Sequence, residues 1–209
     1  MKAFITVLAA SLSFALTATA ADTPKFETYF GFDWERFNPD VADIPSFHAP
    51  GVSGQFVYNF HQGFGVVFDA GFVTKDTLKG ILSNRQDHFL IGPRYAFYNH
   101  SRFTPFAEIM FGGAKASVST DINRVPSILP PSSITLPDNV SATLTKSRTS
   151  FAMMVGGGLD IRLAKHFTYR LFDADYYLTR PVSFITGENV NKNNLRLTTG
   201  VNFTWGAER

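Results

Sequence analysis

The sequence contains no cysteine, so disulfide bonds, thiolate catalysis, cysteine-based metal sites and a lipid-modified N-terminal cysteine are all excluded. It also lacks any internal run of about 18 apolar residues, the length that a transmembrane helix needs. Its mean hydropathy is −0.01. The formal net charge is +2 and no basic run occurs, so nothing indicates nucleic-acid binding. These absences leave a membrane β-barrel open, because strands that alternate apolar and polar residues average to a hydropathy near zero.

Phenylalanine and glycine are abundant, with 22 and 16 residues, and the strand pattern is clearest at 195–205. One face of that segment carries Leu195, Leu197, Thr199, Val201, Phe203 and Trp205. The other face carries Arg196, Thr198, Gly200, Asn202 and Thr204. A period of two predicts a β-strand with one apolar face. The segment is also about as long as a tilted strand must be to cross a bilayer.

Seven further segments alternate in the same way. They span residues 26–34, 53–60, 64–72, 89–98, 106–114, 151–162 and 168–179. Pro93 lacks the amide hydrogen that a sheet ladder needs, so we expect a bulge there. In the segment 168–179, we assign the faces so that the carboxylates point away from lipid. This assignment leaves Arg170 on the outer face near the strand start, where its long side chain can carry the charge to the lipid headgroups.

The connections between these segments alternate in length. Short connections are expected at 61–63, 99–102 and 164–166. Longer ones are expected at 37–52, 75–88, 115–150 and 180–194. Tight turns on one side and longer loops on the other are typical of outer-membrane barrels, and eight strands then place both termini on the turn side.

The volume of the barrel decides which face points inward. A soluble eight-stranded barrel would also alternate, with its apolar face inside. Such an interior holds only side chains or one small ligand, and most of the Phe, Tyr and Trp residues lie on the apolar face. These rings would not fit inside, so they face outward and need a bilayer. The sequence therefore predicts an all-β fold: an eight-stranded antiparallel up-and-down transmembrane β-barrel, with short periplasmic turns and longer external loops.

The N-terminus has the organisation of a secretory signal peptide. Lys2 supplies a positive charge, an apolar core follows at 3–16, and Ala18-Thr19-Ala20 is a small-x-small cleavage site. We expect a signal peptide over 1–20, cleaved after Ala20 or Ala21, and a barrel over 21–209.

Near the chain end, Thr198, Gly200, Phe203 and Trp205 resemble the C-terminal assembly signal of bacterial outer-membrane barrels, although four residues follow the last aromatic. With phrases such as Gly92-Pro93-Arg94-Tyr95, the whole chain resembles the OmpA-like and OmpX-like eight-stranded barrel family. It looks like a barrel-only member, without the peptidoglycan-binding domain. The resemblance implies a monomer in the cell outer membrane of Gram-negative bacteria. Its partners would be the lipid bilayer and, during biogenesis, the outer-membrane assembly machinery.

The interior face carries the candidate site, a set of charged residues. They are Glu27, Asp33, Asp69, Arg94, Glu108, Asp160, Arg162, Asp173, Asp175 and Arg196. Counting across the hairpins places Arg94 opposite Glu108, and places Arg196 between Asp175 and Asp33. Buried charges persist only when they are paired and hydrogen-bonded. We therefore expect ion pairs that plug the lumen, with a gate that passes ions as the alternative.

The histidines do not indicate an enzyme. His61, His100 and His166 fall in expected turns, and His48 and His88 fall in or beside external loops. No Ser-His motif lies in a strand, and no cluster has metal-ligand spacing, so neither a metal nor a cofactor is predicted. The predicted function is a structural or surface role, with the Ser/Thr/Pro-rich loop 118–148 as a possible contact surface or lid. A narrow channel and a lipid A-modifying enzyme are the alternatives.

Overall fold

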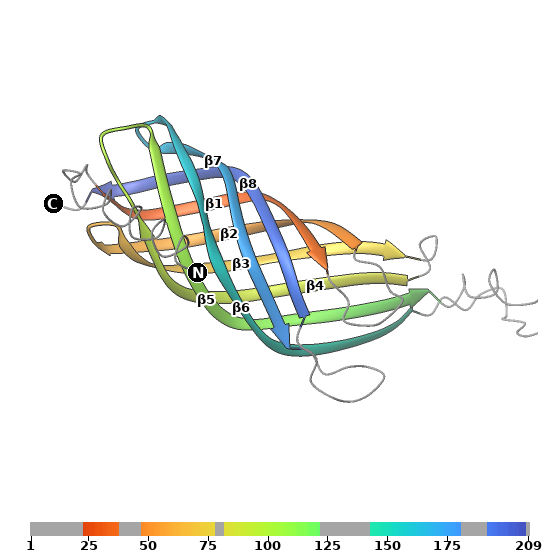
Figure 1. The fold of residues 1–209 in the computed structure, drawn as a ribbon. Coiled ribbons are helices and arrows are strands. Elements are labelled where there is room, and N and C mark those ends of the chain that lie inside the picture. The colour runs from red at the N-terminus through yellow and green to blue at the C-terminus, as the bar shows by residue number, and fades with distance from the viewer. Residues whose placement is uncertain (1–22, 38–46, 78–81, 122–142, 181–191, 208–209) are drawn as a thin grey trace, which may run out of the picture.

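The protein folds into one closed barrel of eight antiparallel strands (Figure 1). The computed structural model describes residues 23–37, 47–77, 82–121, 143–180 and 192–207. The strands are β1 (Pro24–Phe37), β2 (Phe47–His61), β3 (Phe64–Thr77), β4 (Leu82–Ala96), β5 (Phe103–Asp121), β6 (Thr143–Ala164), β7 (Phe167–Arg180) and β8 (Lys192–Ala207). Within these ranges no helix is long and apolar enough to cross a membrane.

Each strand pairs with its neighbours in sequence, and β8 closes the barrel on β1. Three turns join β2 to β3, β4 to β5 and β6 to β7, and they lie at the end where β1 begins and β8 ends (Figure 1). In the first turn Gln62 and Gly63 both have positive φ, 41° and 86°. Positive φ at both central residues follows the right-handed twist of the flanking strands. The predicted eight-stranded up-and-down topology is confirmed.

The strands are longer than their alternation predicted. The β5–β6 ladder continues to the pair Asp121 and Thr143, so much of the predicted loop 115–150 is paired strand. Strands of 14 to 22 residues exceed the roughly 9–11 that a bilayer needs. Polar residues can pair beyond the hydrocarbon layer, which is why the apolar pattern ended earlier than the ladder did. The predicted signal peptide 1–20 and residues 122–142 lie outside the described residues.

The orientation of the two faces is as predicted. The rings of Phe30, Phe68, Phe111 and Phe203 point outward, with 58%, 45%, 44% and 44% of their surface exposed. Inward-facing positions hold buried side chains, including Tyr29, Val57, Met110, Met154 and Tyr177. Large side chains therefore project into the lumen, and the aromatic surface lies on the outside of the barrel.

The bulge expected at Pro93 is absent. The register of β4 on β5 is the same on both sides, with Ile91 opposite Phe111 and Arg94 opposite Glu108. Only the positions of Gly92 and Pro93 are missing from the ladder. The missing proline donor is accommodated by local loss of pairing and not by an extra residue.

A bulge occurs instead in β7 and corrects the prediction for Arg170. The register on β8 shifts between Arg170 and Asp173, so Leu171 and Phe172 are both exposed. The extra residue reverses the alternation, and Arg170 points into the lumen, where it is fully buried. The prediction that Arg170 faces outward was wrong, because it continued the alternation of inward and outward residues through the bulge without counting the extra residue.

Candidate functional site

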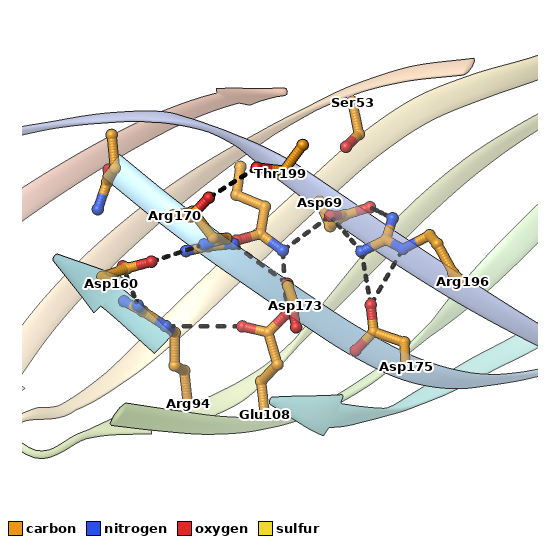
Figure 2. Close-up of polar contacts among 12 residues, drawn as sticks. Ser53, Asp69, Arg94, Glu108, Asp160, Arg170, Asp173, Asp175, Arg196 and Thr199 are labelled. Carbon is orange, nitrogen blue, oxygen red and sulfur yellow. Dashed lines mark hydrogen bonds and ion pairs between the residues drawn. The ribbon is translucent and has the colours of Figure 1, made fainter. Parts of the chain in front are cut away.

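The barrel lumen holds many charges and few of them are positive. Among the described residues, eight carboxylates and three guanidinium groups are buried. The carboxylates belong to Glu27, Asp33, Glu35, Asp69, Glu108, Asp160, Asp173 and Asp175. The guanidinium groups belong to Arg94, Arg170 and Arg196 (Figure 2). If all are ionised, this set carries an excess of five negative charges.

Glu27 accepts hydrogen bonds from four side chains, and it lies toward the turn end of the lumen. Its Oε1 accepts from Arg94 Nη1 and Asn59 Nδ2, each at 2.8 Å, and from the hydroxyl of Tyr98. Its Oε2 accepts from Asn202 Nδ2 at 2.7 Å. Four donors from four different segments satisfy a charge that would otherwise be costly to bury.

Asp160 joins two of the arginines. Arg170 Nε donates to Asp160 Oδ1 at 3.0 Å, and Arg94 Nη2 lies 3.5 Å from Asp160 Oδ2. Both guanidinium groups also lie over the ring of Phe106, at 4.5 Å for Arg94 and 4.3 Å for Arg170. Such cation–π contacts strengthen when the partners are removed from water, so this inward-facing ring helps to hold both cations.

Arg196 organises the second half of the network. Its Nη1 and Nη2 donate to the two oxygens of Asp69 at 3.1 and 3.2 Å, and its Nε donates to Asp175 Oδ2 at 3.0 Å. His88 Nε2 lies 2.6 Å from Asp69 Oδ1. Gln55 links the halves, because its Nε2 lies 2.9 Å from both Asp69 Oδ2 and Glu108 Oε1.

The cross-strand counts were partly right. Arg94 lies opposite Glu108, and Arg196 lies opposite Asp175, as counted. On β1, however, Arg196 faces Glu35, while Asp33 faces Thr198 and accepts from Ser53 Oγ at 2.6 Å. No turn joins β8 to β1, so the local sequence does not fix their register.

Three lumen residues were missed. Arg170 was assigned to the outer face, His88 to the edge of an external loop, and Glu35 lay beyond the predicted end of its strand. His88 and Glu35 continue the inward alternation of β4 and β1, so extending each pattern by a few residues would have found them. Arg170 required knowledge of the bulge.

Arg162 is the predicted lumen charge that lies apart from this network. It is half-buried near the turn end of β6, and its Nη2 donates to the carbonyl oxygen of Asn99 at 3.2 Å. Its role in the structure is to tie the β4–β5 turn to β6.

The residues of the predicted assembly signal occupy both faces of β8. Thr198 is buried, while Phe203 and Trp205 are exposed on the lipid face. Gly200 lies opposite Gly31, and a Cβ added to Gly200 would lie 2.2 Å from the carbonyl oxygen of Phe30. The glycine is thus needed for close packing, and its role in assembly stays a prediction.

The family-model comparison agrees with the closed barrel. The model for the outer membrane protein beta-barrel domain matches residues 6–203. The chain belongs to this family. Its members are barrels of the outer membrane, and the fold implies that this chain is embedded in that bilayer. The sequence matches none of the curated proteins.

Two solved structures are similar to this chain in fold. Neisserial surface protein A matches with a TM-score of 0.58 and 13% identity, covering 87% of this chain and 97% of its own. Ail, the attachment invasion locus protein of Yersinia pestis, matches with a TM-score of 0.51 and 15% identity, covering 86% and 99%. At these identities the likeness supports the architecture and carries no residue-level role.

Proposed function

We propose that this family member is a monomeric outer-membrane barrel with a structural or surface role, whose lumen is plugged by the ion-pair network. The signal peptide 1–20 would direct its export, and the assembly machinery would insert it. N-terminal sequencing of the mature protein tests the cleavage after Ala20 or Ala21.

Contacts across the lumen are the observation that carries this proposal. Arg94 on β4 reaches Glu27 on β1, and Arg196 on β8 reaches Asp69 on β3. Arg170 on β7 donates to Gln55 Oε1 on β2 at 2.6 Å. Each contact joins strands three positions apart around an eight-stranded wall. Opening a path would leave buried charges unpaired, at a cost of about 3–5 kcal/mol for each pair broken.

Conductance in planar bilayers tests the plug. We expect the wild-type barrel to be silent, and Arg196→Ala to raise conductance because it removes the side chain that bridges β8 and β3. Arg85→Ala is the matched control, since Arg85 is exposed and pairs with Asp87 at 2.7 Å away from the lumen. Steady conductance by the wild type would contradict the plug.

A narrow cation channel is the second candidate. The excess of buried carboxylates favours cations over anions, and a recess of about 250 Å³ at the turn end is lined by Tyr98 and Arg162. Tyr98 donates directly to Glu27, so water in the recess would come close to the network. Two results would support this candidate over the plug: swelling of liposomes that contain the protein, and a cation-selective reversal potential in planar bilayers.

The proposed role is not enzymatic. His61 lies at the end of β2, and His100 and His166 lie in turns, while His88 pairs with Asp69 inside the lumen. His48, which was expected in or beside an external loop, is exposed on β2, and its ring stacks on that of Trp34. A changed lipid A mass on expression of the protein would contradict this assignment.

A further inference from the structure

Three carboxylates meet at one point of the lumen. Glu108 on β5 and Asp173 and Asp175 on β7 each offer an oxygen within 4.8 Å of the others. All three residues are buried, with at most 2% of their surface exposed. Figure 2 shows the carboxylates of Glu108 and Asp173 turned toward each other, with Asp175 beside them.

Each of these carboxylates uses one oxygen and leaves the other open. Gln55 donates to Glu108 Oε1 at 2.9 Å, Arg170 to Asp173 Oδ2 at 3.2 Å, and Arg196 to Asp175 Oδ2 at 3.0 Å. The remaining oxygens, Glu108 Oε2, Asp173 Oδ1 and Asp175 Oδ1, are buried without a hydrogen bond. The nearest cationic group to any of these three oxygens is that of Arg94, whose Nε lies 3.6 Å from Glu108 Oε2.

The strand between these acids leaves room for them to approach. Gly156 on β6 lies between Glu108 and Asp175 in the sheet, and Gly158 lies beside Asp173. A Cβ added to Gly156 would lie 2.3 Å from Asp175 Oδ1. Any larger residue at this position would therefore crowd one of the three open oxygens.

We propose that Glu108, Asp173 and Asp175 form a buried binding site for a hard divalent cation, with Ca²⁺ as the best fit. Hard cations are bound by carboxylate oxygens, and Ca²⁺ accepts irregular coordination that Mg²⁺ does not. The donors on the other oxygens hold each ligand in place, as outer-sphere partners do in known metal sites. A divalent cation also reduces the excess of buried negative charge.

Metal content after refolding tests the site. The protein is refolded in detergent either with Ca²⁺ or with a chelator, then desalted and weighed by native mass spectrometry. Refolding with the metal present removes any question of access to the closed lumen. We expect one Ca²⁺ per wild-type barrel, and a higher thermal unfolding midpoint for the Ca²⁺-refolded protein than for the chelator-refolded protein.

Substitutions test which residues bind the metal. Glu108→Gln, which keeps the shape of the side chain, should abolish Ca²⁺ retention, and Gly156→Ala should weaken it. Asp87→Asn, which removes an outward-facing carboxylate, should leave it unchanged. The gel mobility of unboiled samples shows whether each variant has folded, and the wild-type result stands even if one variant does not.

Two results would overturn the proposal. The first is a folded wild-type barrel that retains no Ca²⁺, with an infrared band of a protonated carboxyl that Glu108→Gln removes, because a proton would then occupy the cluster. The second is unchanged Ca²⁺ retention in folded Glu108→Gln, which would locate the metal elsewhere.

Discussion

The two faces of the same eight strands follow different rules. The outer face repeats one kind of contact, rings against lipid, and Phe30, Phe68 and Phe203 are interchangeable examples of it. The inner face has no such repetition. Arg94, Arg170 and Arg196 each have a different set of partners, and those partners come both from neighbouring strands and from strands across the lumen. Hydrophobic burial is non-directional, whereas ion pairs and hydrogen bonds depend on position and angle.

Removing a lumen arginine should have the largest effect. Arg196→Ala leaves Asp69 and Asp175 buried without their shared cation, so we expect the free energy of unfolding to fall by about 3–5 kcal/mol. Urea unfolding in lipid vesicles, followed by gel mobility, measures it. Arg85→Ala breaks an exposed ion pair and should cost about 0–1 kcal/mol. Equal losses in the two variants would remove the distinction between the faces.

A charge on the outer face should come next. Phe30 lies midway along β1 between Phe26, which stacks on Trp205, and Trp34, which stacks on His48. Phe30→Arg therefore places a cation near the centre of the bilayer, and we expect a loss of about 2–4 kcal/mol in the same unfolding assay. A loss no greater than that of a rim substitution would mean that this position is not within the hydrocarbon.

The two faces also differ in how much of their structure could be predicted from the sequence. Alternation identified the eight strands, because a period of two needs no knowledge of neighbours. The lengths of the connections indicated the up-and-down topology, and the small volume of the interior indicated that the rings face outward. The pairing of Arg94 with Glu108 followed from a short hairpin. The partners of Arg196 on β1 and β3 did not, because barrel closure and contacts through the lumen have no local signal. The bulge at Leu171 has no local sequence signal either, so the inward position of Arg170 was not predicted.

A tight internal contact should give an intermediate effect. Gly31 lies under the ring of Tyr29, which also stacks on the guanidinium of Arg170 at 4.1 Å. A Cβ at Gly31 would lie 1.8 Å from Tyr29 Oη and 2.6 Å from the carbonyl oxygen of Thr199, so Gly31→Ala must displace both the ring and the adjacent backbone, and we expect a loss of about 1–3 kcal/mol. Gly113→Ala is the control, since its Cβ would meet nothing closer than 3.8 Å. Equal unfolding midpoints for both alanine variants would mean that the ring and the adjacent backbone both move without cost.

The smallest effect is expected for an apolar exchange on the outer face. Phe30→Leu keeps an apolar group against lipid, so the free energy of unfolding should change by no more than about 0.5 kcal/mol. Measured beside Phe30→Arg, it separates the chemistry of the position from the loss of a ring. A loss as large as that of the arginine variant would show that this ring makes a specific contact.

The strand lengths also shape the rim of the barrel. β5 has 19 residues and β3 has 14, a difference of about 16 Å along the strand direction. Figure 1 shows the far ends of β5 and β6 reaching beyond those of β7 and β8. The described part of the rim at this end is therefore slanted, because the hydrogen-bonded ends of β5 and β6 extend farther than the ends of β7 and β8. A partner that contacts this side of the described rim would therefore meet paired strand backbone.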